Sequence, residues 1–383
     1  MINAFKIISI YIMLYMANAL WKVFYNIYLA EIGLTGAEIG TLNSIIQATI
    51  FVAVVLWGRY ADKKGIRPTL RVGMVATSIL MCSLAYMNGF WILVFFLPVL
   101  TFFYHPLGAL TDAMAMQYAA IEKKHSYGSF RLWGSLGWAL AAIAGGYLFT
   151  SVSLKYTFFI AAILYLINIP FLSTRKKVRT YKANFKLVGL KDVIDNKPLL
   201  FFIIILTFYG IVCSPMFYYL NLYFTELKAS NTVVGLAYAI MAISEIPLFL
   251  LGNKLLKKFG IKSIMILAMS SIVVRYFVLG YLPNVQLALA IGLLQGVSFA
   301  FFLVAAVRII EKLMPEGQHA TAQSIIWGTY IGIGQTIGNL AIGFLLDSTG
   351  MIGVMKISVY ASLGCVLAAI VYFRKFDWEN GHQ

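Results

Sequence analysis

Four ionisable side chains lie deep inside long apolar segments of the sequence: Lys22, Asp112, Glu245 and Arg275. A charge at the centre of such a segment costs roughly 2.5 kcal/mol or more when lipid surrounds it, unless it is paired or hydrated. A carboxylate and a guanidinium can neutralise each other, and a buried carboxylate can take up a proton when its partner cation moves away. These residues are therefore the first candidates for a functional site.

The segments that hold them are too apolar for a water-soluble protein. Of 383 residues, 61% are hydrophobic and 11% are charged, and the mean hydropathy is +0.85. A soluble globule with this composition would expose a large apolar surface, so most of this surface must face lipid. The net charge of +16 does not indicate nucleic-acid binding, because the basic residues stand at the ends of apolar runs.

Twelve apolar runs approach or exceed the roughly 20 residues that a helix needs to cross a bilayer. They are 5–29, 37–56, 70–87, 91–119, 134–148, 156–172, 199–223, 233–251, 264–282, 285–310, 321–346 and 352–373. The first run could be a signal peptide with a cleavage site near Ala17-Asn18-Ala19, but it continues apolar to Leu29, which favours a membrane span. The sequence predicts an all-α integral membrane protein with twelve transmembrane helices.

The lysines and arginines predict the orientation. Most of the 30 basic residues fall on the N-terminus and on alternate loops, which are the loops expected to remain in the cytoplasm. Both termini are therefore predicted to be cytoplasmic, in a protein of the cytoplasmic membrane.

A long basic stretch divides the spans into two sets of six. We predict an N-terminal bundle over 1–172, a cytoplasmic linker over 173–197 and a C-terminal bundle over 198–383. An internal repeat supports this division, since an offset of 195 positions sets Gly40 on Gly235 and Gly65 on Gly260. Two related six-helix halves commonly hold a substrate site between them near the membrane midplane.

One short motif identifies a resemblance. The segment GRYADKKGIR at 58–67, between the second and third predicted spans, resembles the signature loop of the major facilitator superfamily. Its candidate gating residues are Gly58, Asp62, Gly65 and Arg67. The glycines permit a tight turn, Asp62 can meet a helix N-terminus, and the basic residues keep the loop cytoplasmic.

Further segments resemble one branch of that superfamily, which contains lactose permease, nucleoside–proton permeases and phenylpropionate permease. They are HPLGALTDA at 105–113, YGSFRLWGSLGW at 127–138 and SEIP at 244–247, together with Arg275. The resemblance implies that Asp112 and Arg131 bind a solute and that Trp138 stacks on it. A carboxylate and a guanidinium suit hydroxyl groups, and an aromatic face suits the apolar side of a sugar or nucleoside ring. A purely structural pairing of Asp112 with Arg131 is the alternative.

Lys22 has no counterpart in that resemblance. Asn18 and Asn26 lie four residues either side of it, so the three form a polar stripe on one helix face. The stripe is a candidate for solute contact, and Lys22 indicates a solute with a negative or strongly polar group. Neutralisation of Asp112 by Lys22 is an equally good interpretation.

Glu245 and Arg275 could form a buried ion pair and are the candidates for proton coupling, with Asp112 as a second proton carrier. The resemblance implies a histidine and a glutamate in the tenth span, but this chain has Gln295 and Ser298, neither of which can carry a proton. Gln295 is retained as a candidate for solute contact. A structural lock between helices is the alternative role for Glu245 and Arg275.

The predicted function is secondary active transport of a sugar, oligosaccharide or nucleoside by alternating access, coupled to protons. The alternative is an exporter or facilitator of an aromatic acid, drug or lipid. An enzyme is disfavoured, because the sequence shows no nucleophile cluster, metal-ligand set or ATP-binding loop, and its three cysteines are isolated. We expect no cofactor or metal, a monomer, and no partners other than the solute and the bilayer.

Overall fold

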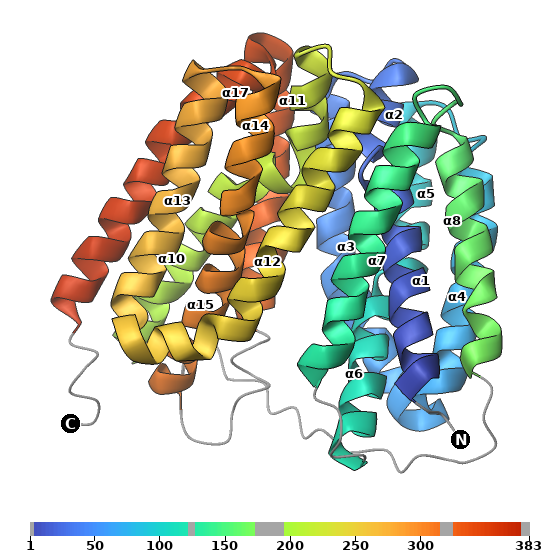
Figure 1. The fold of residues 1–383 in the computed structure, drawn as a ribbon, viewed down its shortest axis with the longest axis horizontal. Coiled ribbons are helices and arrows are strands. Elements are labelled where there is room, and N and C mark those ends of the chain that lie inside the picture. Colours follow the sequence, from blue (N-terminus) through green and yellow to red (C-terminus); the bar gives the residue numbers. More distant parts are fainter. Residues whose placement is uncertain (1–3, 122–126, 173–194, 315–324, 377–383) are drawn as a thin grey trace. The chain divides into compact units, whose positions relative to one another are not determined.

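A computed structural model describes residues 4–121, 127–172, 195–314 and 325–376, and these residues fold almost entirely as helices (Figure 1). Eight helical segments in the described chain are long and apolar enough to cross a membrane. The segment Trp327–Lys375 contains two passes, because the helix is interrupted at Gly350. Three further helices, at Ile66–Leu84, Tyr127–Leu148 and Tyr156–Leu172, complete the twelve predicted passes.

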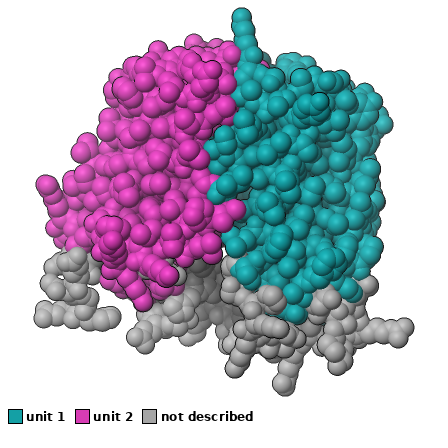
Figure 2. Space-filling model, in the orientation of Figure 1, with its two compact units in different colours: residues 1–183, 228–243 teal, residues 184–227, 244–383 magenta. Residues whose placement is uncertain are grey.

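The chain forms two compact units (Figure 2). Unit 1 contains residues 1–183 and 228–243, and unit 2 contains residues 184–227 and 244–383. The predicted linker lies almost wholly outside the described residues, which resume at 195.

The helices of unit 1 follow the first six predicted spans. They are α1 (Ala4–Lys22), α2 (Tyr25–Glu31), α3 (Gly36–Lys64), α4 (Ile66–Leu84), α5 (Phe90–Tyr104), α6 (Pro106–Ile121), α7 (Tyr127–Leu148), α8 (Tyr156–Ile167) and η1 (Ile169–Leu172). Their ends follow from local sequence. Thr35 caps α3 by accepting a hydrogen bond from the Glu38 backbone N–H, while the Glu38 carboxylate accepts one from the Thr35 N–H. Gly65, at φ +94°, separates α3 from α4.

Glycines bring α7 close to α1. A side chain at Gly137 would lie 2.5 Å from the Ile12 carbonyl oxygen, and one at Gly134 would lie 2.9 Å from the Tyr15 ring. Small residues at such positions let two membrane helices approach at backbone distance. The close packing of α1 on α7 therefore depends on the absence of side chains there.

The helices of unit 2 follow the other six spans. They are α10 (Lys197–Ser214), η2 (Pro215–Tyr219), α11 (Leu220–Glu226), α12 (Asn231–Phe259), α13 (Ile261–Tyr281), α14 (Val285–Ile291), η3 (Gly292–Leu294), η4 (Gly296–Phe301), α15 (Phe302–Leu313), η5 (Trp327–Gly334) and α17 (Gln335–Lys375). The first part of α12, up to Ile243, belongs to unit 1. Three of these segments, η2, η4 and η5, are π-helical.

Unit 2 repeats the glycine-mediated packing seen in unit 1. Gly210 on α10 has no space for a side chain beside the Tyr330 carbonyl, and a side chain at Gly338 on α17 would lie 2.8 Å from the Ile211 carbonyl oxygen. The seventh and eleventh passes thus meet through small residues, as the first and fifth passes do. This correspondence agrees with the internal repeat in the sequence.

Tyrosine hydroxyls join helices of unit 2 that lie far apart in sequence. Each donates to a backbone carbonyl: Tyr209 to Ser298, Tyr219 to Asn339, Tyr223 to Leu279, Tyr276 to Val212, and Tyr372 to Pro198. These bonds give each of the five buried hydroxyl groups a hydrogen-bond acceptor. We call this set of five bonds the tyrosine–carbonyl bonds.

Candidate functional site

The first candidate cluster lies in unit 1 and links Asp112 on α6 to Arg131 on α7 through two tyrosines of α1. The Tyr11 hydroxyl donates to the Asp112 carboxylate at 2.6 Å, and the Tyr11 ring stacks on Tyr15 at 6.0 Å between centroids. The Arg131 guanidinium lies 4.5 Å from the centroid of the Tyr15 ring. The cluster therefore combines a carboxylate, a guanidinium and aromatic faces, which are the groups that bind a hydroxylated ring.

Sequence reasoning named Asp112 and Arg131 but missed the two tyrosines. Tyr11 and Tyr15 are four residues apart, so they share a face of α1. That spacing was available as a signal, but nothing in the sequence placed this face against α6 and α7. Trp138 lies two helical turns after Arg131 and is half-buried.

A second group surrounds Lys22, at the end of α1. The Lys22 ammonium lies 5.0 Å from the centroid of the Tyr104 ring and 5.9 Å from that of Trp21. The Tyr104 and Trp21 rings meet edge to face at 5.1 Å, and His105 follows Tyr104 directly. Lys22 thus contacts aromatic faces, and Asp112 accepts a hydrogen bond from Tyr11.

The two asparagines of the predicted stripe are engaged within unit 1. Asn18 accepts a hydrogen bond from the Tyr165 hydroxyl at 2.7 Å, and Asn26 accepts one from the Asn43 side chain at 3.1 Å. Asn26 and Asn43 are both buried. These bonds join α1 to α8 and α2 to α3, so both asparagines position helices.

The third cluster lies in unit 2, where Gln295 stands between the predicted proton-coupling residues. Arg275 donates to the Gln295 side-chain oxygen at 2.6 Å and to the Ser298 hydroxyl at 2.8 Å. The Gln295 side-chain nitrogen donates to Glu245 at 3.1 Å. The direct ion pair suggested by the sequence is therefore replaced by an amide that bonds to both charges.

Tight backbone packing holds this cluster. The Gly296 N–H donates to the Ser244 hydroxyl at 3.1 Å, and a side chain at Gly296 would lie 2.9 Å from Leu248. This close approach of α12 and η4 places Glu245 beside Gln295. Arg275 is only 1% exposed, and its Nε has no hydrogen-bond partner in the described chain.

The candidate gating residues differ from expectation in their secondary structure. Gly58 and Asp62 lie inside α3, which continues to Lys64, and Arg67 lies in the first turn of α4. Only Gly65 is non-helical, so the predicted loop is a single-residue turn. The helix extends because Lys63 and Lys64 occupy its last turn, where positive charge is stabilised by the helix dipole.

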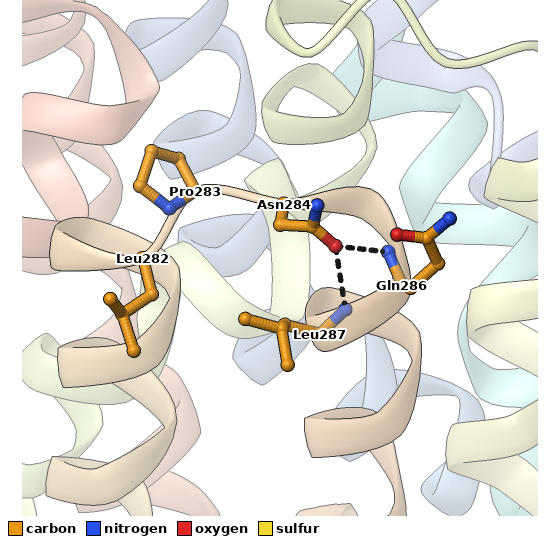
Figure 3. Close-up of a pocket in the computed structure, with 5 residues that line it drawn as sticks. All are labelled: Leu282, Pro283, Asn284, Gln286 and Leu287. Atoms are coloured by element: carbon orange, nitrogen blue, oxygen red, sulfur yellow. Dashed lines mark hydrogen bonds between the residues drawn. The ribbon is translucent and has the colours of Figure 1, made fainter.

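A surface hollow at the turn between α13 and α14 contains none of the predicted site residues. Its lining is Leu282, Pro283, Asn284, Gln286 and Leu287. Figure 3 shows the Asn284 side chain accepting hydrogen bonds from the backbone N–H groups of Gln286 and Leu287. This hollow is best explained as the shape of a helix cap.

The family model described as "MFS_1 like family" matches residues 5–356. The chain belongs to this family. It is thus a major facilitator transporter and an integral membrane protein, which confirms the predicted fold and superfamily. The branch-level residue roles stay predictions.

Individual relatives are similar to this chain over most of its length. The chain is 27% identical to the maltose permease of Geobacillus stearothermophilus over 84% of this chain and 82% of the relative. It is 26% identical to the uncharacterized transporter YwbF of Bacillus subtilis (strain 168), over 84% of this chain and 81% of the relative. A crystal structure of the nucleoside transporter NupG superposes with a TM-score of 0.83 at 18% identity, covering 98% of this chain and 99% of that one.

Proposed function

We propose that this transporter moves a sugar, an oligosaccharide or a nucleoside together with a proton, by alternating access. The observation that carries the proposal is the row Glu245–Gln295–Arg275 in unit 2. It places an ionisable carboxylate next to an amide that is itself bonded to a buried cation. From the basic loops we infer further that the protein lies in the cytoplasmic membrane with both termini in the cytoplasm.

The solute class is supported by the cluster in unit 1. Asp112 and Arg131 offer charged partners for hydroxyl groups, and Tyr11 and Tyr15 lie between them. The named sugar permease among the relatives, 27% identical, agrees with a hydroxylated ring as solute. A nucleoside presents the same combination of hydroxyls and an apolar ring face.

The proton step follows from the chemistry of the Glu245 row. A carboxylate in an apolar environment is stabilised as an anion by a nearby cation and favours its protonated form when that support is withdrawn. Gln295 cannot titrate, but its two hydrogen bonds hold Glu245 close to Arg275, whose positive charge stabilises the carboxylate. Breaking either bond during the transport cycle would favour proton uptake by Glu245.

The experiment compares Glu245→Gln with the wild-type protein in reconstituted vesicles, using maltose and adenosine as test solutes. We expect Glu245→Gln to exchange solute across the membrane at equilibrium but to lose accumulation driven by a proton gradient. Glu311→Gln is the matched control, because Glu311 pairs with Arg308 at the surface and lies outside the row. Gradient-driven accumulation by Glu245→Gln would refute the assignment.

A further inference from the structure

Two interrupted membrane passes meet at Lys22. The first pass is kinked between α1, which ends at Lys22, and α2, which begins at Tyr25. The fourth pass is kinked at His105, between the end of α5 at Tyr104 and the start of α6 at Pro106. The contact between the Lys22 ammonium and the Tyr104 ring brings the two interruptions together. Both interruptions are kinks, because Phe24 and His105 keep helical backbone dihedrals and the His105 N–H still donates to the Thr101 carbonyl.

The charge of Lys22 is not balanced by an acid in the described part of the chain. Its recorded contacts there are the Tyr104 and Trp21 rings, at 5.0 and 5.9 Å. Asp112 lies eight residues beyond Tyr104, which is about 12 Å along a helix. Aromatic faces stabilise an ammonium by about 0.5–2 kcal/mol, which is less than the cost of placing it inside a membrane protein.

A second polar atom at the same place lacks a partner. His105 Nδ1 is buried and makes no hydrogen bond within the described residues. An unsatisfied buried donor or acceptor costs about 1–3 kcal/mol. Within the described ranges, Lys22 lacks an anion and His105 lacks a hydrogen-bonding oxygen. One bound oxyanion would supply both.

We propose that Lys22 and His105 bind an anionic group of the transported solute, with the Tyr104 and Trp21 rings beside it. This inference rests on the proposed transport function and adds an acidic group to its substrate class, as in a sugar acid or a nucleotide. The oxyanion accepts a hydrogen bond from the Lys22 ammonium and a second from the Nδ1–H tautomer of His105. The Asp112–Arg131 cluster of the proposed function would contact hydroxyl groups on the same molecule.

The experiment uses pairs of probes that differ only in charge, measured as binding to purified full-length protein. The pairs are D-glucuronate with D-glucose, adenosine monophosphate with adenosine, and 3-phenylpropionate with 3-phenylpropanol. We expect the anionic member of one pair to bind at least about tenfold more tightly, since a hydrogen bond to a charged group contributes about 1.5–3 kcal/mol. The pair in which the anionic member binds more tightly shows whether the site prefers a carboxylate or a phosphate.

Variants test whether Lys22 is responsible. Lys22→Gln should lose the preference for the anion while still binding the neutral member, and Lys22→Arg should keep it. Lys155→Gln is the matched control, because the Lys155 ammonium lies 5.6 Å from the Tyr156 ring at an exposed turn. Binding of the neutral probe of each pair also shows that the variant is folded.

Three results would overturn the inference: equal binding of both members by the wild-type protein, a preference that survives Lys22→Gln, or no binding of any anionic probe. Failure of the proposed function has a different signature. In that case the wild-type protein would discriminate between the members of a pair, yet neither member would accumulate in vesicles under a proton gradient.

Discussion

Gln295 connects the charged side chains of Arg275 and Glu245 in unit 2 by hydrogen bonds. It accepts a hydrogen bond from Arg275 and donates one to Glu245, because an amide side chain carries both an acceptor oxygen and a donor nitrogen. A histidine or glutamate at this position would add a titrating group. The amide instead keeps the row neutral at its centre and leaves Glu245 as its only acid.

Replacing Gln295 with leucine should destabilise the protein by about 2 kcal/mol. The substitution removes an acceptor from the buried Arg275 and a donor from Glu245, and hydrogen bonds to charged groups contribute about 1.5–3 kcal/mol. The thermal unfolding midpoint in detergent measures the effect. Gln286→Leu, at an exposed helix turn, serves as control and should leave the midpoint within experimental error. An unchanged midpoint for Gln295→Leu would show that the row contributes nothing to stability.

The sequence predicted the charged members of the sites better than the neutral ones. Asp112, Arg131, Glu245 and Arg275 stand out because each is an ionisable residue in or at the edge of an apolar segment. Tyr11, Tyr15 and Tyr104 do not stand out, because the chain contains 23 tyrosines and only the packing of α1 shows which of them meet a charge.

At the scale of elements, the helix pairs depend on glycines at a few contact points. Gly137→Ala should weaken the packing of α7 on α1, because the added carbon would lie 2.5 Å from the Ile12 carbonyl oxygen and 3.0 Å from its Cα. Backbone atoms cannot rotate away as a side chain can. We expect a loss of about 1–3 kcal/mol, as in other overpacked interiors, measured as a lower unfolding midpoint.

Gly108→Ala is the matched control for that prediction. Gly108 lies within α6, and an added carbon there meets no atom within 4 Å. Alanine is favoured over glycine inside a helix by about 1 kcal/mol, so this variant should be neutral or slightly stabilised. If both variants shift the midpoint equally, the contact of α7 with α1 is not limited by Gly137.

The sequence predicted where the membrane helices are, but not all the places where they are interrupted. Apolar run length predicted each membrane pass because a helix must span a fixed thickness of hydrocarbon. The interruptions at His105 and at η2 each coincide with a proline, Pro106 and Pro215, which is a sequence signal for a kink. The interruption at Val23–Phe24 and the π-helical segments η4 and η5 left no comparable signal. They depend on which neighbouring side chains satisfy the displaced backbone groups, and that is a tertiary property.

At the scale of the whole molecule, the distribution of basic residues makes a topological prediction that cysteine labelling tests. In a background where Cys82, Cys213 and Cys365 are replaced, Ser153→Cys should react with a membrane-impermeant maleimide on intact cells. Lys63→Cys should react only after the cells are permeabilised. Both positions are exposed on the protein, so the difference reports the side of the membrane. The reverse pattern would place the termini outside.

The tyrosine–carbonyl bonds of unit 2 have a consequence for biogenesis. A chain that inserts while it is being synthesised can close each bond only after the later partner has left the ribosome. Tyr223 must wait for Leu279, 56 residues later, and the bond of Tyr372 to Pro198 spans 174 residues. The second half of the protein therefore completes its cross-helix bonds only when its last helix arrives. A premature stop codon shortly before Tyr372 would leave a nearly full-length chain that forms the other four tyrosine–carbonyl bonds but lacks the one that joins the last helix of unit 2 to its first. Membrane quality-control proteases would be expected to remove it.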